Sequence, residues 1–123
     1  MRLLIFAAAA LVAFASPALP SPYPVQRVDL ANFRYAPKPI VLAAGKPVTL
    51  MFVNVAKGGH NFNARDFFAR SRILAGSAPG GRIELSGGQT RSVTLVPSAG
   101  TYRVHCSHFL HSSFGMTATI LVR

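Results

Sequence analysis

The chain has 123 residues, which is enough for one domain with its own core but not for two. Half of the residues are hydrophobic, so the composition excludes an intrinsically disordered chain. Lys and Arg number 13 against three acidic residues, a formal charge of +10, yet they form no run and accompany no nucleic-acid recognition motif. This charge either serves solubility or attracts an acidic protein or, weakly, an anionic membrane surface; nucleic acid is not expected as a partner.

The first 18 residues have the layout of a secretory signal peptide. A short positive start precedes the apolar residues 3–14, and small residues then allow cleavage after Ala15 or Ala18. The twelve apolar residues are too few for a membrane-spanning helix, which needs about 20; an uncleaved N-terminal anchor is the alternative. We expect residues 1–18 to be removed, with Ala18 favoured, and the mature protein to be exported to a bacterial-type periplasm.

The rest of the chain reads as a stiff Pro-rich lead-in, residues 19–24, followed by one domain, residues 25–123. In this domain, short hydrophobic segments alternate with Gly and Pro turns. Strands are expected at residues 25–33, 40–42, 48–55, 82–85, 90–96, 101–106 and 116–122. The pattern predicts a monomeric, all-β Greek-key sandwich of about seven to eight strands with one short helix.

Two of these segments contribute the clearest candidate core residues. Val28, Leu30 and Phe33 are expected on the core side of the first strand. Residues 66–74 are the expected helix, with its apolar face formed by Phe67, Phe68 and Leu74.

Cys106 is the single cysteine, so no disulfide can form within the chain. In an exported protein such a thiol is an inert core residue, half of an intermolecular disulfide, or a metal ligand. Strand alternation places Cys106 on the same face as Tyr102 and Val104, which look like core residues, and His105 on the opposite face. We therefore expect the thiol to point inward.

The segment after Cys106 supplies further ligands of the same chemical kind. It joins two strand ends, so Cys106, His111 and Met116 can converge at one end of the sandwich. A thiolate, an imidazole and a thioether suit copper, whose known sites of this kind use two His and one Cys with a weak axial Met. His60 is the candidate for the second imidazole, because it lies outside the C-terminal cluster and follows the end of a predicted strand.

Taken together, these motifs resemble the cupredoxins, the family of plastocyanin, azurin, pseudoazurin and rusticyanin. The resemblance rests on Phe33-x-Tyr35-x-Pro37, the turn at residues 44–48, Gly59-His60-Asn61 and the spacing Cys106-x4-His111-x4-Met116. That spacing is longer than the plastocyanin loop and is similar to the loops of rusticyanin and auracyanin. The resemblance implies one type 1 (blue) copper ion, bound by His60, Cys106, His111 and Met116.

The resemblance also implies roles for residues around the site. Asn61 would tie its loop to the backbone near Ser107, unless it only satisfies its own turn. Gly59 would allow the backbone to approach the metal closely, with its carbonyl a distant axial neighbour, unless it is a plain turn glycine. Phe109 and Leu110 would form an apolar docking patch around His111, unless they simply cap the core.

His105 and His108 fit the ligand pattern less well and are expected on the surface or in a loop. If His108 replaced His111 as the ligand, the gap to Met116 would become longer than relatives use.

Three functions remain open: a one-electron carrier that cycles between Cu(I) and Cu(II), a copper-handling protein for binding, delivery or resistance, and a cupredoxin-shaped module without metal. The ligand set argues against the third, and we favour electron transport with an acidic redox partner such as a cytochrome. An enzyme is not expected, because oxidases and nitrite reductases of this fold use further domains and His-rich copper sites.

Overall fold

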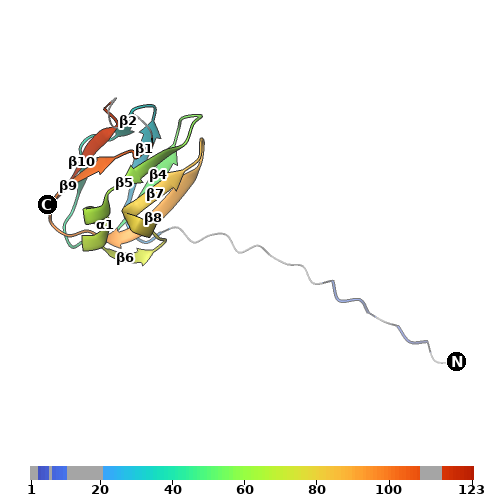
Figure 1. Ribbon diagram of the computed structural model, residues 1–123. Coiled ribbons are helices and arrows are strands. Elements are labelled where there is room, and N and C mark those ends of the chain that lie inside the picture. Colours follow the sequence, from blue (N-terminus) through green and yellow to red (C-terminus); the bar gives the residue numbers. More distant parts are fainter. Residues whose placement is uncertain (1–2, 6, 11–20, 109–114) are drawn as a thin grey trace.

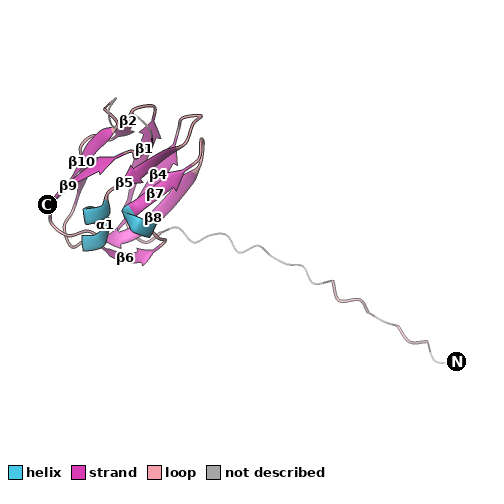
Figure 2. Ribbon diagram, viewed as in Figure 1, coloured by secondary structure: helices cyan, strands magenta, loops and turns pink. Residues whose placement is uncertain are grey.

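The computed structural model describes residues 3–5, 7–10, 21–108 and 115–123 of the chain. In these residues, two five-stranded β-sheets form a sandwich, and one short α-helix and one 3₁₀ turn lie beside them (Figure 1). Figure 2 shows that strands make up most of the domain. The predicted all-β sandwich is therefore confirmed.

The first sheet has the strand order β2-β1-β4-β8-β6. β1 is parallel to β4, and the other neighbours are antiparallel. Its strands are β1 (Val25–Ala31), β2 (Arg34–Ala36), β4 (Val48–Asn54), β6 (Arg72–Ala75) and β8 (Thr90–Val96).

The second sheet has the strand order β3-β10-β9-β5-β7 and carries the residues of the candidate site. β3 and β10 are parallel, whereas β10, β9, β5 and β7 pair antiparallel. The elements of this half are β3 (Ile40–Leu42), β5 (His60–Asn63), α1 (Arg65–Arg70), the 3₁₀ turn η1 (Pro79–Gly81), β7 (Arg82–Leu85), β9 (Gly100–His105) and β10 (Thr117–Val122).

The core lies between the two sheets and is built from alternate residues of their strands. Aromatic side chains pack together in it. The ring centroids of Phe52 and Phe62 are 4.7 Å apart, and the Tyr35 ring meets the Phe62 ring edge-on with a centroid distance of 5.6 Å. Val28 and Leu30 are fully buried, as predicted for the inward side of β1. Apolar burial of this extent is the main contribution to the stability of the sandwich.

The described residues form ten strands in place of the seven or eight predicted, because three short strands carry no clear apolar alternation. These are β2, β5 and β6, and their sequences are RYA, HNFN and RILA. Phe33 was expected in the core but lies in the turn between β1 and β2, with a positive φ of 60° and 46% exposure. The strand ends at Ala31, so the alternation does not extend to Phe33.

The helix is shorter than predicted. Phe67 and Phe68 are buried as expected, but the chain leaves the helix at Ser71, whose backbone is extended and whose hydroxyl donates to the Phe67 carbonyl at 2.7 Å. The following residues pair with the edge of β8 as β6. Leu74 is therefore 42% exposed on an edge strand and does not belong to a helical core face.

The N-terminal segment adds no regular structure in its described part. Residues 3–5 and 7–10 are exposed and belong to neither helix nor strand. Within the described residues, no helix has the length and apolar character required to span a membrane. Cleavage of residues 1–18 stays a prediction.

Candidate metal centre

His60 opens β5 at one end of the second sheet and is 3% exposed. Its Nε2 lies 3.3 Å from Oδ1 of Asn32, which sits in the turn between β1 and β2. An amide oxygen can only accept, so Nε2–H is the donor and Nδ1 is the nitrogen that would bind a metal. A hydrogen bond of this kind fixes both the tautomer and the ring orientation of a ligand histidine.

Cys106 and Met116 lie at the same end of this sheet, at the base of the loop between β9 and β10. Cys106 directly follows β9, Met116 directly precedes β10, and both are 0% exposed. The Cys106 backbone N–H donates to the Met116 carbonyl at 3.1 Å, which brings the two ends of the loop together. The third predicted donor, His111, lies outside the described residues, as do Phe109 and Leu110.

Asn61 connects the segment of His60 to the segment of Cys106. Its Oδ1 accepts from the Ser107 backbone N–H at 2.9 Å, and its Nδ2 donates to the Ser107 hydroxyl at 2.6 Å and to Glu84 Oε2 at 3.0 Å. The predicted tie between Asn61 and the backbone at Ser107 is thus confirmed. These bonds fix the position of residues 60–61 relative to residues 106–107.

Two ionisable groups near this end have shifted pKa values. Partial burial alone would raise the pKa of the Glu84 carboxyl, but hydrogen bonds from Asn61 and His108, with the charges of His108 and Arg82, outweigh it and lower that pKa. Burial, reinforced by the negative charge that Cys106 can carry, strongly raises the pKa of Tyr35. Tyr35 therefore stays neutral, and its hydroxyl donates to the Asn61 carbonyl at 2.6 Å.

The two other histidines have different surroundings. His108 Nε2 lies 2.5 Å from Glu84 Oε1, and its ring centroid is 6.3 Å from that of His60. A Cβ at Gly59 would lie 3.2 Å from His108 Cε1, so Gly59 leaves space for this ring. His105 is exposed on the outer face of the second sheet, which agrees with the expected surface location.

Three residues with structural roles here were missed by sequence reasoning: Asn32, Glu84 and Asn54. Asn54 ends β4 and is fully buried; its Nδ2 donates to the carbonyls of Gly58 and Leu85 at 2.9 and 3.1 Å. It thereby joins the β4–β5 and β7–β8 turns beside His60. The available signal was a polar residue that closes an apolar strand directly before a turn.

The described donors fit copper better than a hard metal. A buried imidazole, thiol and thioether are soft or intermediate ligands, which copper accepts in both oxidation states. Within the described part of the chain, no three His, Cys, Asp or Glu side chains form a group that could hold a metal ion. The predicted set of four ligands could not appear as such a group, because Met116 is of another residue type and His111 lies outside the described residues.

Comparisons with known proteins give a family match and several similar folds. The model of the family described as copper binding proteins, plastocyanin/azurin family, matches residues 25–123. No curated protein sequence matches the chain.

The similar solved structures include two auracyanins. Dithionite-reduced auracyanin of the photosynthetic bacterium Roseiflexus castenholzii is 21% identical with a TM-score of 0.60, over 80% of this chain and 96% of that one. Auracyanin B is 21% identical with a TM-score of 0.59, over 93% and 95%. A multicopper oxidase of Campylobacter jejuni is 11% identical with a TM-score of 0.63, over 87% of this chain but 32% of the oxidase. At these identities the likeness establishes the fold.

Proposed function

The chain belongs to the plastocyanin/azurin family of copper-binding proteins, the cupredoxins, and from this premise we propose that it is a mobile one-electron carrier. One copper ion would be held by His60, Cys106, His111 and Met116. The bound ion would supply a Cu(I)/Cu(II) couple. The observation that carries the proposal is the meeting of buried His60, Cys106 and Met116 at one end of one sheet.

The chain's own part in electron transfer is to hold the ligands still. A site that barely rearranges between oxidation states exchanges electrons quickly. The Asn32 bond fixes the His60 ring, the Asn61 bonds fix the strand ends relative to each other, and the Cys106–Met116 backbone bond closes the loop. Burial of the thiol excludes water and oxidants from Cys106.

The proposed location rests on the signal-peptide-like leader, residues 1–18, and the proposed partner rests on the net charge. The apolar residues 3–14 support export to a periplasm. Loss of Arg2 with the leader would leave twelve basic against three acidic side chains, about +9. Such a surface favours an acidic redox protein such as a cytochrome, with Phe109 and Leu110 as the apolar centre of the contact.

A copper-handling role is the alternative. The family description names copper binding, which an electron carrier and a copper-handling protein have in common. An oxidase activity is not proposed. The chain spans about a third of the multicopper oxidase it resembles, so the activity of that whole protein is not carried over.

The site is tested by the absorption spectrum of the purified protein with Cu(II). We expect an intense visible band from thiolate-to-copper charge transfer and one copper per chain. Cys106→Ser should abolish the band while circular dichroism still shows a β fold. His111→Ala should lose or strongly change the band, whereas the matched variant His108→Ala should leave it essentially unchanged.

Other outcomes would refute parts of the proposal. A normal band in Cys106→Ser would show that the ligand set is wrong, and loss of the band in His108→Ala alone would make His108 the ligand. Ready transfer of copper to a chelator, together with slow electron exchange with every carrier tried, would favour copper handling.

A further inference from the structure

The outer face of the second sheet carries a row of polar side chains across four strands. Thr117 on β10 is opposite His105 on β9, His105 is opposite Asn63 on β5, and Asn63 is opposite Arg82 on β7. The neighbouring positions on β9 and β5 are buried, so strand alternation turns this row away from the core. Since His105 and Cys106 point to opposite faces, the row is separate from the candidate metal centre.

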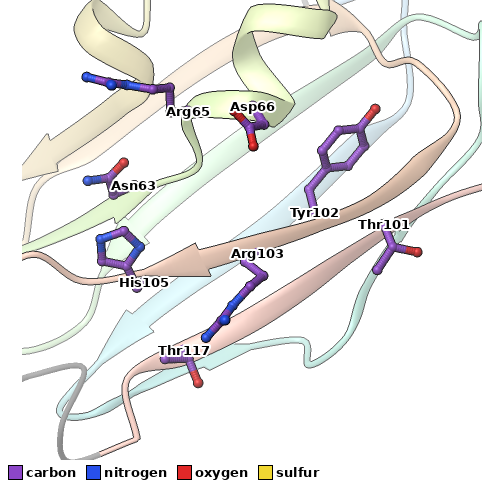
Figure 3. A pocket seen from close by; sticks show the side chains of 8 residues that line it. All are labelled: Asn63, Arg65, Asp66, Thr101, Tyr102, Arg103, His105 and Thr117. Carbon is purple, nitrogen blue, oxygen red and sulfur yellow. The ribbon is translucent and has the colours of Figure 1, made fainter.

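A hollow of about 710 Å³ lies over this row, lined by Asn63, His105 and Thr117 together with Arg65 of α1 and Arg103 of β9 (Figure 3). An adjoining hollow of about 380 Å³ shares Asn63, Arg65 and His105 with it. Arg82 also lines this second hollow. We call the combined depression the arginine hollow and define it by Asn63, Arg65, Arg82, Arg103 and His105.

The arginine hollow has an excess of positive charge. Arg65, Arg82 and Arg103 are exposed, and within the described residues none of them forms an ion pair. Asp66 is the one carboxylate among the described lining residues. A concave surface with an excess of positive charge attracts anions, and most strongly those with several charges.

We propose that the arginine hollow binds a compact oxyanion with several charges, of the diphosphate or tricarboxylate kind. The planar guanidinium group presents its donors in a fork that matches carboxylate and phosphate oxygens. The three arginines come from α1, β7 and β9, so a ligand with several charged oxygens engages more of them than a single carboxylate does. Asn63 and Thr117 add uncharged donors at the floor, where Figure 3 shows Asn63 next to His105.

The test is isothermal titration calorimetry of the purified protein at constant ionic strength, with inorganic pyrophosphate, citrate and acetate as probes. Pyrophosphate or citrate should bind at one site and acetate far more weakly. The triple variant Arg65→Gln/Arg82→Gln/Arg103→Gln should weaken binding by about tenfold or more, because charge-assisted hydrogen bonds are the strong ones. Stronger binding of pyrophosphate or of citrate identifies the phosphate or the carboxylate form of the ligand, and either supports the site.

The matched control removes three charges from other positions: Arg34→Gln/Lys46→Gln/Arg72→Gln. Arg34 and Arg72 lie on β2 and β6 of the first sheet, and Lys46 in the β3–β4 turn. This control has the same net charge as the first triple variant and should keep binding within about twofold of the original protein. If the first triple variant does not fold, the single exposed change Arg103→Gln should still weaken binding.

Three results would overturn the proposal. Equal weakening in both triple variants would mean that the overall charge attracts the anion without a site. Unchanged affinity in Arg103→Gln and in the first triple variant would place the anion elsewhere. Failure of both multivalent anions to bind, with binding of an acidic peptide at these arginines, would make the hollow a protein-docking surface.

Discussion

Asn61 is the residue whose loss should disturb the site most without removing a ligand. It is 1% exposed and makes three side-chain hydrogen bonds, two to Ser107 and one to Glu84. Asn61→Ala should lower the free energy of unfolding by about 2–3 kcal/mol, because it leaves the Ser107 N–H without this acceptor. Denaturant unfolding of the metal-free protein measures this change.

The control for this prediction is Asn63→Ala on the same strand and the same face. No side-chain hydrogen bond of Asn63 occurs within the described part of the chain, so its replacement should change stability by less than about 0.5 kcal/mol. Similar losses in the two variants would contradict the role given to Asn61.

Glu84 makes the stability of this region depend on pH. Its pKa lies below the ordinary value of 4.5, so the folded state favours the carboxylate. Its contribution is fully present above the pKa of the unfolded chain and is lost as the pH falls through the lower folded pKa. Because the side chain is half exposed, Glu84→Gln should cost less than about 1 kcal/mol at neutral pH.

The measurement is the unfolding free energy of both proteins between neutral pH and about pH 3. The difference between them should shrink as the pH is lowered through the folded pKa of Glu84. Asp66→Asn, which removes an acid without an ion pair among the described residues, is the matched control. A difference that grows as the pH falls would show that folding raises the pKa of Glu84 and does not lower it.

At the scale of elements, the turn between β7 and β8 packs closely against the turn between β4 and β5. A Cβ at Gly87 would lie 2.0 Å from the Lys57 carbonyl oxygen and 2.6 Å from its carbon. Gly87→Ala must therefore move backbone, and we expect a loss of about 1–3 kcal/mol in thermal or denaturant unfolding.

Gly58→Ala is the comparison for Gly87→Ala, because a Cβ at Gly58 would meet nothing within 4 Å. It should be close to neutral. A tolerated Gly87→Ala would mean that the two turns can separate without cost, and the role of Asn54 in joining them would then be small.

The sequence predicted those elements whose pattern is local. Alternating apolar residues and Gly or Pro turns indicated the sandwich, and the spacing of Cys106, His111 and Met116 indicated one metal-binding loop. β5 and β6 could not be predicted, because HNFN and RILA become strands only by pairing with distant segments. The Asn32–His60 bond joins the turn between β1 and β2 to the start of β5 in the other sheet, so no local pattern reveals it.

At the scale of the whole molecule, the charge of about +9 that remains once Arg2 is lost with the proposed leader should govern association with the proposed redox partner. Electron exchange with an acidic cytochrome should be fast at low salt and should slow markedly as salt is added, since the screening length falls to about 8 Å at physiological ionic strength. Stopped-flow kinetics at several salt concentrations measures this dependence. Leu110→Glu should slow the exchange without changing the copper spectrum.

A rate that does not depend on salt would contradict the electrostatic part of this prediction. An unchanged rate in Leu110→Glu would place the contact elsewhere on the molecule. Phe109 and Leu110 lie outside the described residues, so this kinetic measurement is the direct test of their role.

The pairing of β3 with β10 has a consequence for how fast the protein folds. Ile40 lies opposite Ile120, and Val25 of β1 lies opposite Thr49 of β4, so both parallel pairs join segments that are well separated in the chain. Closing such long loops lowers the chain entropy before the stabilising contacts form. Folds dominated by distant pairings therefore reach the native state in roughly milliseconds to seconds. Under the proposed export, the chain would therefore engage the export machinery while still unfolded, and would form its two parallel strand pairs only afterwards.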